Sequence, residues 1–179
     1  QALVRPGDIV LVDRDCHKSH HYGMVLAGAQ VCYLDSYPLN EYSMYGAVPL
    51  REIKHQLLAL KAAGKLDQVR MLLLTNCTFD GLVYNVERVM EECLAIKPDL
   101  IFLWDEAWYA FGRFSPFYRR TRTAMGACEE LADRYHSDAY REEYAKFKKS
   151  VGDIDISNKK ALSSRLMPDP DQVRLRVYC

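Results

Sequence analysis

Short apolar runs alternate along the chain with longer stretches in which apolar residues recur every three or four positions. Apolar runs of this length, bounded by Gly, Pro or charged residues, predict β-strands. We predict strands at residues 7–13, 29–36, 69–76, 99–107 and 173–178. The third run, VRMLLLTN, is apolar almost throughout, which is typical of a strand that is covered on both faces.

The stretches between these runs have a helical period. In the clearest of them, residues 50–64, the apolar side chains fall on one face of a helix that ends at Gly64. Further helices are predicted at residues 16–27, 85–98 and 121–150. Residues 37–49 and 151–172 are rich in turn-forming residues, and we predict that both segments are loops.

The alternation of strands and helices predicts an α/β fold with a mostly parallel sheet and helices on both of its faces. In such sheets, ligands bind at the carboxyl ends of the strands. Residues 13–17, 75–80 and 105–108 each follow or end a predicted strand, and each contains polar side chains. We therefore expect these three polar clusters to lie together at one edge of the sheet.

Composition agrees with a single globular domain of 179 residues. Lys plus Arg and Asp plus Glu number 24 each, so charge gives no reason to expect nucleic acid or an anionic membrane as a partner. No apolar run has the length of a membrane span, and the first 20 residues do not resemble a signal peptide. The six cysteines are scattered without a CxxC pair, and we expect reduced thiols in the cytoplasm.

The segment DRDCHKSHHYG at 13–23 contains one cysteine and three histidines. On a helix, Cys16 with His20 and His17 with His21 form i, i+4 pairs, but each pair offers a metal ion only two ligands. A Cys16–His20 nucleophile would lack a third group to orient the base. The simplest interpretation of His20 and His21 is that both are solvated on a helix surface. His17 differs, because it lies where the first strand meets its helix.

The segment LIFLWDEAW is an apolar strand that ends in Asp105 and Glu106. Such a strand resembles the magnesium-binding strand of nucleotide hydrolases, but those proteins also need a GxxxxGK[ST] loop, which the sequence lacks. A carboxylate at the end of a buried strand also suits the protonated pyridine nitrogen of pyridoxal phosphate (PLP). A flat histidine ring can stack on the same cofactor.

Three segments carry a resemblance to a known family. LVDRDCHKSHHYG, TNCTFDGLVYN and LWDEAWYAFGRFSPFY resemble, in that order, parts of the PLP domain of the bacterial ornithine/lysine/arginine decarboxylases. The resemblance runs from residue 1 to about residue 130 and resumes at the last predicted strand. It implies a fold-type-I PLP enzyme that releases CO2 and an amine from a basic amino acid. It also implies a homodimer or a higher homo-oligomer.

Carried over residue by residue, the resemblance gives roles to five side chains. His17 would stack on the cofactor ring, and Asp105 would pair with the pyridine nitrogen. Ala107 would pack beneath the ring, and Trp108 would line the same pocket. Thr78, in the element TFDG, would support the site, although a simple turn explains that element equally well.

The resemblance also indicates which functional elements of the family are missing from residues 1–179. The chain begins without Met and ends on an uncapped strand-like run, so we expect it to be an internal piece of a longer protein. The family's phosphate-binding loop precedes the segment that matches Gln1, and its Schiff-base lysine follows the strand that ends near Cys179. We therefore expect residues 1–179 to be a partial PLP-binding domain that is inactive alone, with 134–172 as a polar helix and loop or an insertion.

Other functions remain open at this stage. The sequence DEAW is close to the Asp-Glu-Ala-His of aminotransferases and amino-acid C-acyltransferases of the same fold type. A non-catalytic module with this fold and a metal-binding module are further alternatives. The sequence does not choose among lysine, ornithine and arginine as the substrate.

Overall fold

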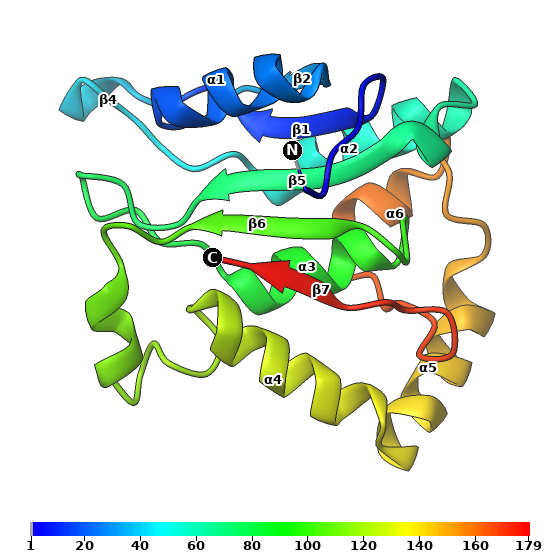
Figure 1. Ribbon diagram of the computed structural model, residues 1–179. Coiled ribbons are helices and arrows are strands. Elements are labelled where there is room, and N and C mark those ends of the chain that lie inside the picture. The colour runs from blue at the N-terminus through cyan, green and yellow to red at the C-terminus, as the bar shows by residue number, and fades with distance from the viewer. Residues whose placement is uncertain (1) are drawn as a thin grey trace.

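The computed structural model describes residues 2–179 and contains a five-stranded sheet in which every strand pairing is parallel (Figure 1). The strand order is β2-β1-β5-β6-β7. The strands are β1 (Ile9–Asp13), β2 (Gln30–Leu34), β5 (Val69–Thr75), β6 (Ile101–Asp105) and β7 (Arg176–Tyr178). The prediction of an α/β fold with a mostly parallel sheet is confirmed, and all five strands lie where the apolar runs placed them.

Helices cover both faces of the sheet, as predicted (Figure 1). One face carries α1 (Lys18–Ala27). The other face carries α2 (Leu50–Ala62), α3 (Val86–Leu94), α4 (Ala124–Tyr135), α5 (Asp138–Val151) and α6 (Lys159–Ser163). Three short 3-10 helices, η1 (Asn40–Tyr42), η2 (Leu66–Gln68) and η3 (Ala110–Phe114), lie in the connections.

Alternation along the strands divides the buried side chains into two clusters. On β5 and β6, Leu72, Leu74, Phe102 and Trp104 belong to the larger cluster, under α2 to α6. The residues between them, including Leu73, belong to the smaller cluster, which packs against α1. Because successive side chains of a strand point to opposite faces, each central strand contributes to both clusters.

Two segments differ from their predictions. The helix predicted at 121–150 is two helices, because the Ser137 side chain accepts a hydrogen bond from the Tyr140 backbone N–H and so begins α5. The loop predicted at 151–172 contains α6, which begins at the capping side chain of Asn158. The loop predicted at 37–49 holds a small antiparallel pair, β3 (Pro38–Leu39) with β4 (Met44–Tyr45), beside η1.

Residues 2–179 contain no helix that is long and apolar enough to cross a membrane. The cysteines in this part of the chain are free thiols.

Candidate functional site

Three strands deliver polar side chains to the carboxyl edge of the sheet. Asp13 ends β1, Thr75 ends β5 and Asp105 ends β6, and Thr75 and Asp105 are direct partners in the ladder. The Thr75 backbone N–H donates to Asp13 Oδ2 over 2.9 Å. The three polar clusters therefore meet at one edge, as the sequence predicted.

Asp105 has a hydrogen-bond partner on each of its two carboxylate oxygens. Its Oδ2 lies 2.8 Å from His20 Nε2, and its Oδ1 accepts a hydrogen bond from the Ala107 backbone N–H over 3.1 Å. Burial alone would raise the pKa of Asp105, but these two hydrogen bonds and the nearby His17 hold that pKa below its ordinary value. Asp105 is therefore a carboxylate at neutral pH despite being mostly buried.

His17 begins α1 at the same edge. Its Nδ1 lies 2.8 Å from Ser19 Oγ and accepts a hydrogen bond from the Ser19 backbone N–H, so the ring caps the helix. The residue is exposed, which leaves the ring accessible to a ligand. His17 is also close enough to Asp105 to influence its pKa. The stacking role of His17 stays a prediction.

The interpretation of His20 as a solvated bystander is wrong. His20 lies in the first turn of α1, and its side chain is only 20% exposed because it faces Asp105. His21 instead takes the contact with Cys16, whose Sγ lies 3.4 Å from His21 Nε2. Burial raises the pKa of Cys16 to about 12, so this thiol is not an activated nucleophile. Among residues 2–179, no group of three or more His, Cys, Asp or Glu side chains could hold a metal ion.

A buried asparagine, which the sequence analysis did not single out, connects the loops that follow β5 and β6. Asn76 is completely buried, and its amide donates to Glu106 Oε1 over 2.7 Å and to the Arg122 carbonyl over 2.8 Å. Its Oδ1 accepts from the Tyr84 backbone N–H. Glu106 Oε1 also accepts from the Ala124 N–H. A polar residue directly after an apolar strand was the available signal for this network.

The structure separates the other predicted site residues into two groups. Ala107 is exposed beside Asp105, so these two and His17 lie near one another. Trp108 is 60% exposed, and its ring contacts Phe79 at 4.8 Å between centroids. Thr78 lies in the same turn as Phe79 and uses its Oγ1 to accept from the Leu82 backbone N–H. Trp108 therefore connects the loop after β6 with the turn after β5.

That turn has an uncommon backbone. Cys77 adopts a φ of 73°, which costs free energy in a residue with a side chain, and Gly81 adopts a φ of 79°, which glycine accepts readily. The N–H groups of Cys77 and Thr78 both donate to the Leu82 carbonyl. The Gly81 N–H donates to the Thr78 carbonyl, so TFDG forms the turn that the simple interpretation predicted, although backbone groups rather than the Asp80 side chain supply these hydrogen bonds.

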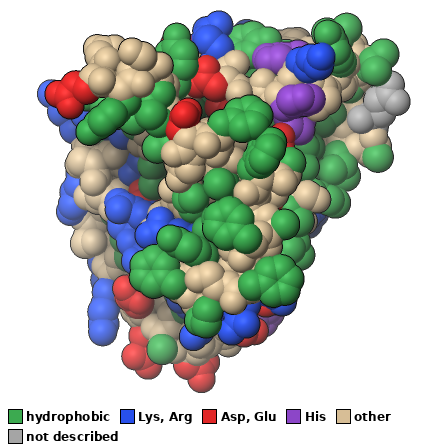
Figure 2. All heavy atoms as spheres, turned by 90° about the vertical axis from the view of Figure 1, so that its left-hand side faces the viewer, with side chains coloured by type: hydrophobic (Ala, Val, Ile, Leu, Met, Phe, Trp, Pro, Cys, Tyr) green, Lys and Arg blue, Asp and Glu red, His purple; other side chains and the backbone are tan. Residues whose placement is uncertain are grey.

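The carboxyl edge also exposes many aromatic side chains. Figure 2 views the molecule from this edge and shows histidine and acidic side chains close together, with hydrophobic side chains spread beside them. Five aromatic side chains in the loops after β5 and β6 are exposed by 58 to 85%, whereas Tyr84 and Tyr109 in the same loops are buried: the exposed ones are Phe79, Trp108, Phe111, Phe114 and Phe117. A surface of this kind is typical of an interaction site.

The residues at this edge fit the pyridine end of PLP. Each Asp105 oxygen accepts one hydrogen bond in the structure, and a carboxylate oxygen can accept a second, from a pyridinium N–H. Close by, Asp13 Oδ1 and Thr75 Oγ1 are buried without a hydrogen-bond partner among the described residues. A cavity of about 270 Å³ adjoins the site between α1 and the sheet, with His20 in its wall. This fit concerns the pyridine ring of PLP and no other part of the cofactor.

Comparison with known proteins shows which family the chain matches. Residues 1–135 match the model of the Orn/Lys/Arg decarboxylase major domain. The chain is 37% identical over 123 residues to the lysine decarboxylase LdcA of Pseudomonas aeruginosa, and 34% identical over 125 residues to the biodegradative arginine decarboxylase of Escherichia coli. These alignments cover 65% and 66% of this chain but only 16% of each relative.

Solved structures give the same result for the fold. The constitutive lysine decarboxylase of E. coli matches 69% of this chain with a TM-score of 0.56 and 26% identity. The lysine decarboxylase LdcF of Francisella novicida also matches 69%, with a TM-score of 0.55 and 29% identity. In both cases the match covers 17% of the other chain.

Proposed function

Since this chain belongs to the Orn/Lys/Arg decarboxylase major-domain family, we propose that the protein containing it is a PLP-dependent decarboxylase of lysine, ornithine or arginine. The chain spans 16% of the relatives described above, so the activity is proposed for the whole protein. When bound, PLP supplies an electron sink that accepts the charge left after CO2 is lost. The other roles that we propose for the site belong to side chains of this chain.

The observation that carries the proposal is the state of Asp105. Its pKa lies below the ordinary value although the group is mostly buried, so it presents a negative charge in a region of low dielectric. In our proposal this carboxylate holds a proton on the pyridine nitrogen. A cation nearby strongly stabilises a buried carboxylate such as Asp105, whereas without a cation the carboxylate is poorly solvated.

His20 and the Ala107 backbone orient that carboxylate. With one hydrogen bond to each oxygen, they fix the plane of the carboxyl group without using all of its acceptor sites. His17 would lie against the face of the ring from the start of α1. His17 is therefore proposed as a binding residue, whereas His20 is proposed as a positioning residue.

The exposed aromatic residues support a proposed homodimer or higher homo-oligomer. Phe114 is 85% exposed and Phe117 78% exposed, in the loop that follows Trp108. A second copy that covers this surface would exclude water from the neighbouring Asp105. Sedimentation of the intact protein should show an oligomer that the double substitution Phe114→Ser and Phe117→Ser weakens. An unchanged oligomer would contradict this assignment of the surface.

The activity is tested by measuring CO2 and amine release from lysine, ornithine and arginine by the intact protein. We expect one of the three to be decarboxylated, and Asp105→Asn to lower kcat by about two orders of magnitude or more, because the amide cannot balance a pyridinium charge. Asp67→Asn is the matched control, since Asp67 is exposed in η2, just before the amino end of β5. No release of CO2 from any of the three would refute the proposal.

A further inference from the structure

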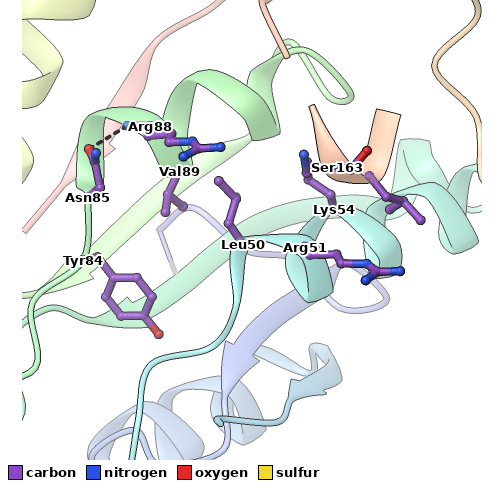
Figure 3. Close-up of a pocket in the computed structure, with 9 residues that line it drawn as sticks. Leu50, Arg51, Lys54, Tyr84, Asn85, Arg88, Val89 and Ser163 are labelled. Carbon is purple, nitrogen blue, oxygen red and sulfur yellow. Dashed lines mark hydrogen bonds between the residues drawn. The ribbon is translucent and has the colours of Figure 1, made fainter. Parts of the chain in front are cut away.

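A second cavity lies on the face of the sheet opposite to the one that carries α1. It has a volume of about 370 Å³ and lies between the first turns of α2 and α3 and the short helix α6 (Figure 3). The lining residues Leu50, Val89 and Leu162 pack in the larger core cluster, whereas α1 and its histidines pack on the opposite face. This volume is in the range of pockets that bind small molecules.

The lining of this pocket combines apolar walls with an excess of positive charge. Arg51, Lys54 and Arg88 line it, and among residues 2–179 Glu92 is the one carboxylate that contacts them. Glu92 is fully buried and is shared, with Oε2 at 2.6 Å from Lys54 Nζ and Oε1 at 2.7 Å from Arg88 Nε. One negative charge therefore faces three positive charges.

The three cations differ in how many donors they have left. Lys54 is 2% exposed, and its Nζ already donates to Glu92, to the Ala161 carbonyl and to the Ser164 carbonyl. The Arg88 guanidinium donates from Nε alone, which leaves its two terminal nitrogens without a partner among the described residues. The Arg51 side chain makes no hydrogen bond or ion pair with any of residues 2–179. The free donors therefore belong to the two arginines.

These arginines lie on the two helices that flank the pocket. Figure 3 shows Arg51 on α2 and Arg88 on α3, with the side chain of Leu50 between them and Val89 beside Arg88. Guanidinium groups bind carboxylates and phosphates through paired hydrogen bonds, and apolar walls favour a ligand with an apolar body. Both features point to the same class of ligand.

We propose that this pocket binds a small organic anion, a carboxylate or a phosphate monoester, with its charged group between Arg51 and Arg88. The apolar body of the ligand packs on Leu50, Val89 and Leu162. Because α6 supplies Leu162 and follows the part of the chain that matches the family model, the pocket combines family-matching and additional sequence. Binding therefore stabilises the packing of α6 on α2.

The test is a calorimetric titration of the intact protein, saturated with PLP, with phenyl phosphate and with inorganic phosphate. We expect phenyl phosphate to bind more tightly than inorganic phosphate, and Arg51→Gln to weaken its binding about tenfold or more. Lys148→Gln is the control, because it removes one positive charge from an exposed position of α5. Amide hydrogen exchange across Lys159–Ser163 should slow when phenyl phosphate is added.

Three results would overturn the inference. One is the absence of saturable binding up to about 20 mM, which is weaker than small-molecule sites of this size normally show. Another is equal weakening by Arg51→Gln and Lys148→Gln, which would indicate a general effect of charge. The third is binding that Asp105→Asn abolishes and Arg51→Gln leaves intact, which would place phenyl phosphate at the candidate cofactor site. Failure here leaves the proposed decarboxylase activity untouched.

Discussion

At the scale of single residues, the charge of Asp105 depends on a partner that is distant in the sequence. His20 and Asp105 are separated by 85 positions and meet because α1 begins beside the end of β6. The motif CHKS indicated His17, and the strand ending in DEAW indicated Asp105. Neither the CHKS motif nor the DEAW strand shows which face of α1 lies against the sheet. The sequence alone therefore predicts, wrongly, that His20 is solvated.

Replacing His20 with Ala should raise the pKa of Asp105. In the wild type this pKa lies below the ordinary value of 3.8, so the Asp105 carboxylate stabilises the fold above about pH 4, and this contribution is lost as the pH falls through the folded-state pKa. We expect His20→Ala to lower the free energy of unfolding by about 1 to 2 kcal/mol at neutral pH, and by less in acid.

NMR titration of the Asp105 side-chain carbon, together with urea unfolding at several pH values, checks this expectation. His21→Ala is the matched control, because His21 contacts Cys16 and Tyr33 but not Asp105. An Asp105 pKa that is the same in His20→Ala as in the wild type would show that the 2.8 Å contact has no energetic role.

Asn76 should be the most sensitive polar residue behind the site. Asn76→Ala removes hydrogen bonds to Glu106, to the Arg122 carbonyl and to the Tyr84 N–H, and leaves these groups short of partners in a buried region. We expect a loss of about 2 to 4 kcal/mol in the free energy of unfolding, measured by denaturant titration. The exposed Asn40→Ala should change it by less than about 0.5 kcal/mol, and a similar small change for Asn76→Ala would refute the assignment.

At the scale of elements, one buried lysine ties α2, α3 and α6 together. Lys54 of α2 binds Glu92 of α3 and two carbonyls at α6, those of Ala161 and Ser164. The helical period predicted α2 and α3 because their apolar faces are regular. The helical period did not predict α6, because that helix has only five residues and is held by contacts with other elements.

Lys54→Met should destabilise the protein by about 3 to 5 kcal/mol, because Glu92 would remain buried with Arg88 as its one ion-pair partner in the described part of the chain. Adding Glu92→Leu should recover much of this loss, since an apolar pair of similar volume avoids an unbalanced buried charge. A double-mutant cycle of unfolding free energies measures the coupling. Additive losses would contradict a coupled pair, and hydrogen exchange should show α6 opening first in Lys54→Met.

At the scale of the whole molecule, the parallel sheet followed from the alternation of apolar runs and helical stretches. The convergence of Asp13, Thr75 and Asp105 followed from the sheet, because parallel strands end at one edge. The helical period predicted most of α5, but the packing of residues 136–172 on the rest of the domain could not be predicted, because few side chains of this polar segment enter the larger core, such as Tyr140 and Leu166. The second pocket is lined in part by α6 from this segment, so the sequence did not predict the pocket either.

The central claim is that the carboxyl edge holds a proton on a pyridine nitrogen through Asp105. The most direct test loads the intact protein with PLP that carries ¹⁵N in its ring and records the nitrogen chemical shift at neutral pH. We expect a protonated nitrogen in the wild type and an unprotonated one in Asp105→Asn. An unprotonated nitrogen in the wild type, or a protonated one in the variant, would contradict it.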